Sequence, residues 1–87
     1  MKSALLVARA TDRARVQVAR ATKRWSLTSR QRQVLTEIAE ARPNRTIASI
    51  LGISERTVEV HVTAMLEKAQ VESRAELIVA VYTLGVT

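Results

Sequence analysis

The side chains in this chain that could do chemistry are mostly basic. Its 87 residues contain 14 Lys plus Arg, 8 Asp plus Glu, one His and no Cys. Without Cys there is no disulfide framework, thiolate nucleophile or Cys-based zinc site, and a single His leaves no His pair for a metal or a triad. The sequence also offers no paired carboxylates in a pocket, no activated nucleophile and no Gly-rich phosphate loop, so we expect no enzyme, no metal and no cofactor.

The basic residues are concentrated at the N-terminus. Residues 1–26 contain seven Lys or Arg and one acid, Asp12, whereas residues 27–87 contain equal numbers of bases and acids. The whole formal net charge of +6 therefore lies in the first segment. This excess points to a polyanionic partner, most often nucleic acid. The alternative is an ordinary solvated helix surface.

One predicted helix, residues 55–69, has a face suited to reading DNA bases. At about 100° per residue, one apolar stripe is predicted to be core: Val58, Val62, Met65, Leu66 and Ala69. The opposite face carries Arg56, Val60, Thr63 and Glu67, flanked by Glu59 and Ala64. Small apolar groups can contact thymine methyl groups, and a carboxylate such as that of Glu59 can accept a hydrogen bond from the cytosine amino group. A plain solvent face or a protein contact are the alternatives.

The elements that would position this face are all helical. Residues 1–26 lack Gly and Pro and favour a helix. Capping signals open three later helices: Thr28 with Gln31 for a helix running to about residue 41, Ser54 for residues 55–69, and Ser73 with Glu76 for residues 74–84. Asn44 is predicted to cap a short helix over residues 45–51.

Residues 45–69 show the pattern of a helix-turn-helix, in which a short helix, a tight Gly turn and a longer helix pack together. Ala48 is small where two helices must approach closely, and Gly52 suits a left-handed turn. Ile47, Leu51, Ile53 and Val58 supply the core.

The two terminal helices carry apolar surface that needs a partner. The last helix is apolar nearly all round, which favours self-association, with packing on the N-terminal helix as the alternative. The N-terminal helix has a thin seam at alternating spacings of three and four: Ala4, Val7, Thr11, Ala14, Val18, Ala21 and Trp25. This seam could pack either within the chain or on a second copy.

From Leu27 to about Tyr82 the chain resembles the LuxR-type (GerE-like) helix-turn-helix domain of bacterial transcription regulators. The resemblance rests on residues 27–35 (LTSRQRQVL), 44–48 (NRTIA), 51–61 (LGISERTVEVH) and 73–77 (SRAEL). It implies a four-helix DNA-binding domain over residues 27–87, preceded by a basic N-terminal or linker helix over residues 1–26. In the family the third helix enters the major groove, and the fourth commonly forms the dimer contact.

The resemblance also implies roles for individual residues. Base-reading positions match Glu59, Val60 and Thr63, and phosphate-contact positions match Arg45, Arg56, Thr57, Lys68 and Arg74. The expected dimer interface comprises Leu77, Ile78, Val81 and Tyr82. His61 is interpreted as helix packing or a neighbour of the phosphate backbone.

The chain departs from the family pattern in three places. Ala41 and Gln70 stand where Gly is usual, so Gln70 must adopt a left-handed conformation or change the turn. Glu59 and Glu67 place two acids on the outward face, which lowers non-specific affinity for DNA. The basic N-terminal segment is expected to offset this by contacting flanking phosphates.

We therefore predict a sequence-specific regulator that binds double-stranded DNA as a homodimer. The N-terminal helix belongs either to a stand-alone regulator or, as a linker, to a longer one. The alternative function is a protein-interaction module whose acidic face binds RNA polymerase or a sensor domain. We expect a cytoplasmic location and no membrane role, because the longest apolar run, residues 77–86, is about half a membrane span.

Overall fold

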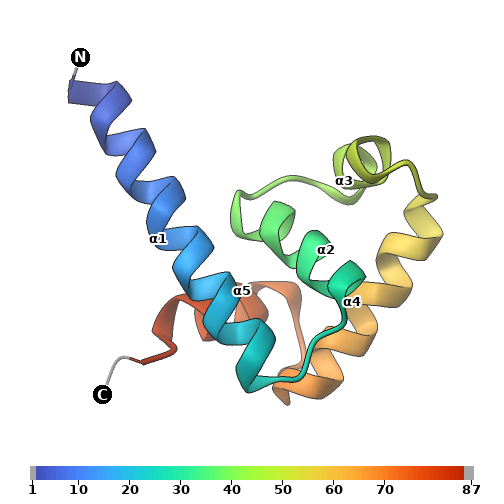
Figure 1. Ribbon diagram of the computed structural model, residues 1–87. Helices are drawn as coiled ribbons and strands as arrows, with labels where there is room; N and C mark the ends of the chain where they lie inside the picture. The colour runs from blue at the N-terminus through green and yellow to red at the C-terminus, as the bar shows by residue number, and fades with distance from the viewer. Residues whose placement is uncertain (1, 86–87) are drawn as a thin grey trace.

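The computed structural model describes the backbone of residues 2–85 and the side chains of residues 12–85. Over this range the chain forms five helices (Figure 1): α1 (Lys2–Arg24), α2 (Ser29–Ala39), α3 (Asn44–Leu51), α4 (Glu55–Ala69) and α5 (Arg74–Thr83). The all-α prediction is confirmed, with helix ends within about two residues of those expected. Seam residues Ala4, Val7 and Thr11 lie outside the described side chains.

Three predicted capping side chains begin helices as expected. The backbone N–H of Gln31 donates to the hydroxyl of Thr28 at 3.1 Å, and Gln31 Oε1 accepts from the backbone N–H of Thr28 at 3.0 Å. Ser54 and Ser73 accept from the backbone N–H groups of Thr57 and Glu76. These bonds satisfy N–H groups that have no partner inside their helices.

Asn44 does not cap α3, and that prediction is wrong. Pro43 occupies the N-cap position without a side-chain bond, and Asn44 is the first helical residue. Proline presets the extended backbone that precedes the helix, which frees the Asn44 side chain for another contact, described below.

Four helices end on a residue in the left-handed conformation. At α3 this is Gly52 (φ 67°), as predicted, but Ser26 (φ 53°), Ala41 (φ 62°) and Gln70 (φ 58°) follow α1, α2 and α4. Each of these three turns has the two reversed hydrogen bonds of a Schellman motif; in the α2 turn, Ala41 N–H donates to Ile38 at 2.8 Å and Arg42 N–H to Glu37 at 3.1 Å. Of the two alternatives predicted for Gln70, a left-handed conformation or a changed turn, the structure shows the first.

The core lies between α2, α3 and α4 and is closed by α1 and α5. Its fully buried side chains come from all five helices, and the largest are Leu35, Ile38, Ile47, Met65 and Leu77. From α1, Val18 and Ala21 are buried and belong to this core cluster. The described part of the α1 seam therefore packs within the chain. This is one of the two alternatives predicted for the seam.

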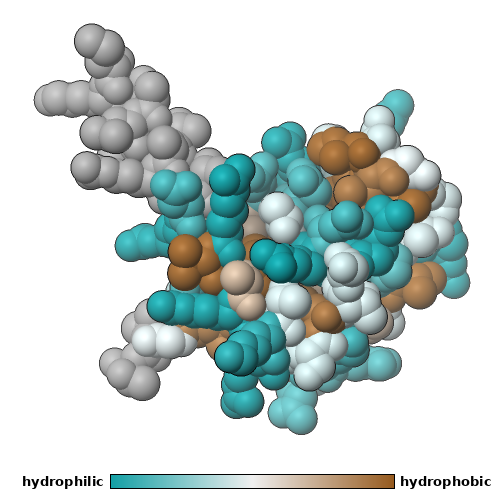
Figure 2. Space-filling model, in the orientation of Figure 1, coloured by the Kyte–Doolittle hydropathy of each residue, from teal (hydrophilic) through white to brown (hydrophobic). Residues whose placement is uncertain are grey.

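The surface is mainly hydrophilic in the view of Figure 2, with a hydrophobic patch over α3. The exposed large hydrophobic residues are Val16, Ile50, Val60 and Val79. In the described part of the chain, no helix combines the length and the apolar character that crossing a membrane requires.

Candidate nucleic-acid interface

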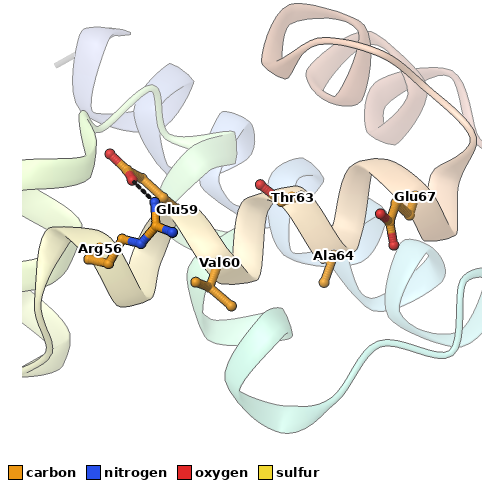
Figure 3. Close-up of a pocket in the computed structure, with 6 residues that line it drawn as sticks. All are labelled: Arg56, Glu59, Val60, Thr63, Ala64 and Glu67. Atoms are coloured by element: carbon orange, nitrogen blue, oxygen red, sulfur yellow. Dashed lines mark hydrogen bonds and ion pairs between the residues drawn. The ribbon is translucent and has the colours of Figure 1, made fainter.

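The outward face of α4 is a continuous strip whose residues are exposed except for Ala64, which is half-buried. Figure 3 shows its six residues along the helix, lining one shallow depression: Arg56, Glu59, Val60, Thr63, Ala64 and Glu67. Val58 and Met65 are buried on the opposite side, and Val62, Leu66 and Ala69 pack against the core. The helix phase predicted from the sequence is therefore confirmed.

The centre of this strip is small and uncharged. Val60 is 54% exposed, and Thr63 and Ala64 follow it on the same face (Figure 3). No bulky side chain stands between them in the strip, so another surface can approach the helix closely. A strip of this shape fits a DNA major groove sterically.

The charges of the strip lie toward its ends. Arg56 Nη1 lies 3.4 Å from Glu59 Oε2, and both side chains are exposed. Such a pair is weak and easily exchanged for other partners. Arg56 can therefore turn to a phosphate, and Glu59 can turn to a base.

At the N-terminal end of α4, the predicted phosphate contact Thr57 is engaged locally. Its hydroxyl lies 2.9 Å from the hydroxyl of Ser54, and its backbone N–H donates to the same oxygen at 3.0 Å. Both groups sit at the positive end of the α4 dipole, which favours anions. Thr57 is thus placed where a phosphate contact is possible, although its hydroxyl already has an intrachain partner.

Two further predicted phosphate contacts lie on the surface. Arg45 is exposed in the first turn of α3. Lys68 is exposed in the last turn of α4, and its Nζ donates to the backbone oxygen of Ser26 at 3.0 Å and to Gln31 Oε1 at 2.8 Å. Because an ammonium has three donors, one remains for a further acceptor.

Arg74 has a different position from the one expected of a phosphate contact. Its guanidinium donates to Asn44 Oδ1 and to the backbone oxygen of Arg42, and burial lowers the pKa of its guanidinium from the ordinary value. These bonds tie the start of α5 to the start of α3. This arrangement favours a structural role for Arg74 over the predicted phosphate contact.

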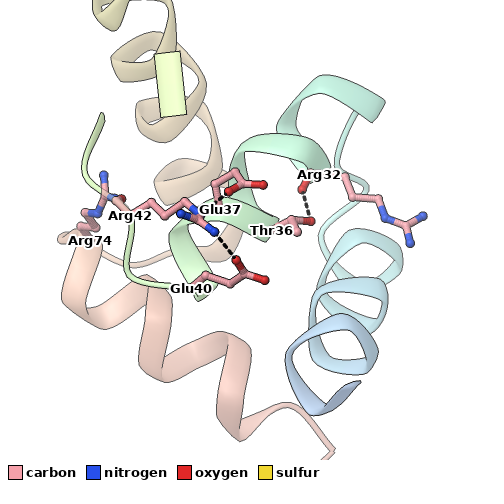
Figure 4. A network of polar contacts seen from close by, with 6 residues as sticks. All are labelled: Arg32, Thr36, Glu37, Glu40, Arg42 and Arg74. Carbon is pink, nitrogen blue, oxygen red and sulfur yellow. Dashed lines mark hydrogen bonds and ion pairs between the residues drawn. The ribbon is translucent and has the colours of Figure 1, made fainter. Parts of the chain in front are cut away.

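No local pattern predicts the ion pairs around Arg42 (Figure 4). Arg42 Nε lies 2.7 Å from Glu37 Oε2, and Arg42 Nη2 lies 3.1 Å from Glu40 Oε2. Together with the bond from Arg74, these contacts fix the loop between α2 and α3. The loop in turn sets the position of α3, which packs against α4.

The predicted dimer residues on α5 need correction. Leu77 is 0% exposed and Val81 is 1% exposed within a single chain, because both lie in the core. Ile78 and Tyr82 are half-buried, and the Tyr82 hydroxyl donates to the backbone oxygen of Ala39 at 2.8 Å. Val79, at 60% exposed, is the large apolar residue that α5 leaves on the surface.

His61 is half-buried on α4, between the core stripe and the outward strip. This position is in keeping with a packing role. Within residues 12–85, no group of three or more His, Cys, Asp or Glu residues is arranged to hold a metal ion.

Comparison with known proteins agrees with this geometry. The family described as "Bacterial regulatory proteins, luxR family" (GerE) matches residues 25–81. The chain is 48% identical over 56 residues to the nitrate/nitrite response regulator protein NarL of Escherichia coli (strain K12), a match that covers 64% of this chain and 26% of that protein. No solved structure gives a significant match.

Two other relatives show the same partial overlap. An uncharacterized transcriptional regulatory protein, YhcZ, of Bacillus subtilis (strain 168) is 46% identical over 54 residues, covering 62% of this chain and 25% of that protein. The transcriptional regulatory protein FixJ of Rhizobium meliloti (strain 1021) is 42% identical over 53 residues, covering 61% and 26%. The chain thus spans about a quarter of the length of these relatives.

Proposed function

The chain belongs to the luxR family of bacterial regulatory proteins, and from this premise we propose that it binds double-stranded DNA sequence-specifically to regulate transcription. The observation that carries the proposal is the small, uncharged centre of the α4 strip, held outward by a buried helix-turn-helix core. The names of its relatives as transcriptional or response regulators support the same function.

In this proposal α4 lies in the major groove and its outward strip reads base edges. Val60 contacts thymine methyl groups, Thr63 bonds to a base edge, and Glu59 accepts from a cytosine amino group after leaving Arg56. Arg45, Arg56, Thr57 and Lys68 contact phosphates, which orient the domain without specifying sequence.

We propose that the protein acts as a homodimer through the exposed side of α5. Exposed Ala75, Val79 and Thr83 share one face of this helix, and a two-fold contact there would bury Val79 against its copy. Dimerisation would set two α4 helices about one DNA turn, roughly 34 Å, apart. The target would then be an inverted or direct repeat.

A protein-interaction module is the second candidate, and one observation favours it. Glu59 and Glu67 both lie on the α4 strip, and acids facing a polyanion reduce its affinity. In this alternative the strip binds a protein such as RNA polymerase or a sensor domain, and the chain is indifferent to DNA at low salt.

Selection of bound duplexes from a random DNA library, followed by sequencing, tests the proposal. A repeated or two-fold motif is the expected result for a dimeric regulator. Recovery of DNA with no enriched motif would contradict sequence-specific recognition, and no recovery at low salt would leave the protein-interaction module.

A further inference from the structure

A polar depression lies where the C-terminal ends of α1 and α4 meet. It is lined by Arg24 and Trp25 from the end of α1 and by Lys68, Ala69 and Gln70 from the end of α4. Two cations from segments more than 40 residues apart therefore share one open site. We call this the α1–α4 notch.

The two sides of the α1–α4 notch are held together firmly. Ala21, one turn before the end of α1, is fully buried, and Trp25 packs against the core. The Schellman turn after α1 presents the backbone oxygen of Ser26 to Lys68 Nζ at 3.0 Å. Arg24 is therefore carried on a fixed backbone beside Lys68.

Both cations retain the capacity to bind an anion. Within residues 12–85, the ion pairs formed are those of Arg42 with Glu37 and Glu40 and of Arg56 with Glu59, so neither Arg24 nor Lys68 forms an ion pair with a carboxylate of this range. Lys68 keeps one free N–H donor, and a guanidinium suits the oxygens of a phosphate. Arg24 and Lys68 also lie at helix C-termini, where a cation interacts favourably with the helix dipole. That interaction alone would not require the two side chains to line the same open depression.

The position of the α1–α4 notch relative to α4 points to the DNA backbone. A helix of 15 residues is about 22 Å long, whereas the major groove is about 12 Å wide. When the middle of α4 lies in the groove, its ends reach the flanking phosphates. Its C-terminal end carries Glu67 and a negative dipole end, so a phosphate there needs added positive charge.

We propose that Arg24 and Lys68 together bind a DNA backbone phosphate beyond the C-terminal end of α4, which makes α1 part of the DNA-binding surface. This inference rests on the proposed function and deepens it. It assigns a defined contact to one of the basic residues of α1.

Arg24→Ala tests this contact, with Lys23→Ala as its matched control. Both residues are exposed in the last turn of α1, carry the same charge and line a second depression beside Leu84 and Gly85, but only Arg24 also lines the α1–α4 notch. Dissociation constants for a selected duplex are measured across a salt series, after circular dichroism shows that each variant is folded. We expect Arg24→Ala to weaken binding about threefold or more and to reduce the salt slope by about 0.9, while Lys23→Ala stays within about 1.5-fold.

A shortened duplex adds a second readout. Base pairs are removed singly from the end next to the C-terminus of α4. When the contacted phosphate is lost, the affinity of the unmodified protein and of Lys23→Ala should fall by the same factor, whereas that of Arg24→Ala, which holds this phosphate through Lys68 alone, should fall by a smaller factor. If Arg24→Ala and Lys23→Ala lost equal affinity for the full-length duplex, or if neither lost any, the inference would be overturned while the proposed function stood. If the unmodified protein binds no duplex at all, the proposed function fails and the inference fails with it.

Discussion

The side-chain amide of Gln17 in α1 donates to the backbone oxygen of Val81 in α5 at 2.9 Å, across 64 residues of sequence. The same nitrogen donates to Leu84 at 2.9 Å, and Gln17 Oε1 accepts from Arg20 at 3.0 Å. Gln17 is 7% exposed, so its buried amide donates to two carbonyls at the end of α5, where the last carbonyls of a helix lack the usual intrahelical bonds; the Val81 oxygen also accepts from the Leu84 N–H at 3.4 Å. This contact makes α1 an integral part of the domain.

Gln17→Met should therefore destabilise the fold. Methionine has a similar length but no donor, so the Val81 and Leu84 oxygens lose their side-chain partner, at a cost of about 1–3 kcal/mol. Thermal and urea denaturation followed by circular dichroism measure this. Arg15→Met is the control, since Arg15 is exposed on the same helix and surface changes usually stay within about 0.5 kcal/mol. Unchanged stability in Gln17→Met would contradict the docking of α1.

Ala41→Gly should stabilise the protein. Ala41 is exposed and has φ 62°, a conformation that glycine adopts without the steric cost borne by alanine. We expect a gain of about 0.5–1 kcal/mol, a rise in melting temperature of several degrees for a domain of this size. Ala19→Gly, an exposed site within α1, should instead cost about 1 kcal/mol. A lower melting temperature for Ala41→Gly would contradict the left-handed turn.

Local signals predicted much of this fold. Cap residues fixed the starts of α2, α4 and α5, Gly52 fixed the helix-turn-helix turn, and the apolar stripe of α4 gave its phase. Each of these signals acts over a few residues, so it can be recognised without tertiary information. The outward strip, including Val60 and Thr63, followed directly from the helix phase.

The errors came from long-range contacts. Asn44 has a good capping side chain, but Arg74, 30 residues later, occupies it. Because α5 is apolar nearly all round, its sequence does not distinguish the core face from a dimer interface, and Leu77 and Val81 are predicted at the interface. Only the packing of α5 against α1 and the core shows which side is buried. The ion pairs of Arg42 with Glu37 and Glu40 depend on the turn after α2, which takes its left-handed conformation at an alanine.

The two faces of α5 should respond differently to mutation. Leu77→Ala removes a fully buried side chain and should cost about 2–5 kcal/mol of stability. Val79→Asp changes an exposed residue, so the protein should fold normally but dimerise at least about tenfold more weakly, because like charges would meet at a two-fold interface. Sedimentation equilibrium measures the dimer constant, and Val16→Asp, at an exposed valine on α1, is the control. A dimer unaffected by Val79→Asp would place the interface elsewhere.

Residues on the α4 strip should control which sequence is bound, whereas Arg45 should control how tightly any sequence is bound. Val60→Ala and Thr63→Ala each remove a group proposed to touch a base edge, so discrimination at one or two base pairs should fall toward zero from about 1–3 kcal/mol per mismatch. Both residues are exposed, which leaves the core intact. Arg45→Ala should weaken all duplexes by a similar factor and reduce the salt slope by about 1. Parallel library selections with Val60→Ala and Thr63→Ala measure the ranking of sequences, and dissociation constants of Arg45→Ala across a salt series measure the uniform loss and the slope. If Val60→Ala and Thr63→Ala kept the original ranking of sequences, the α4 strip would not be the reading surface.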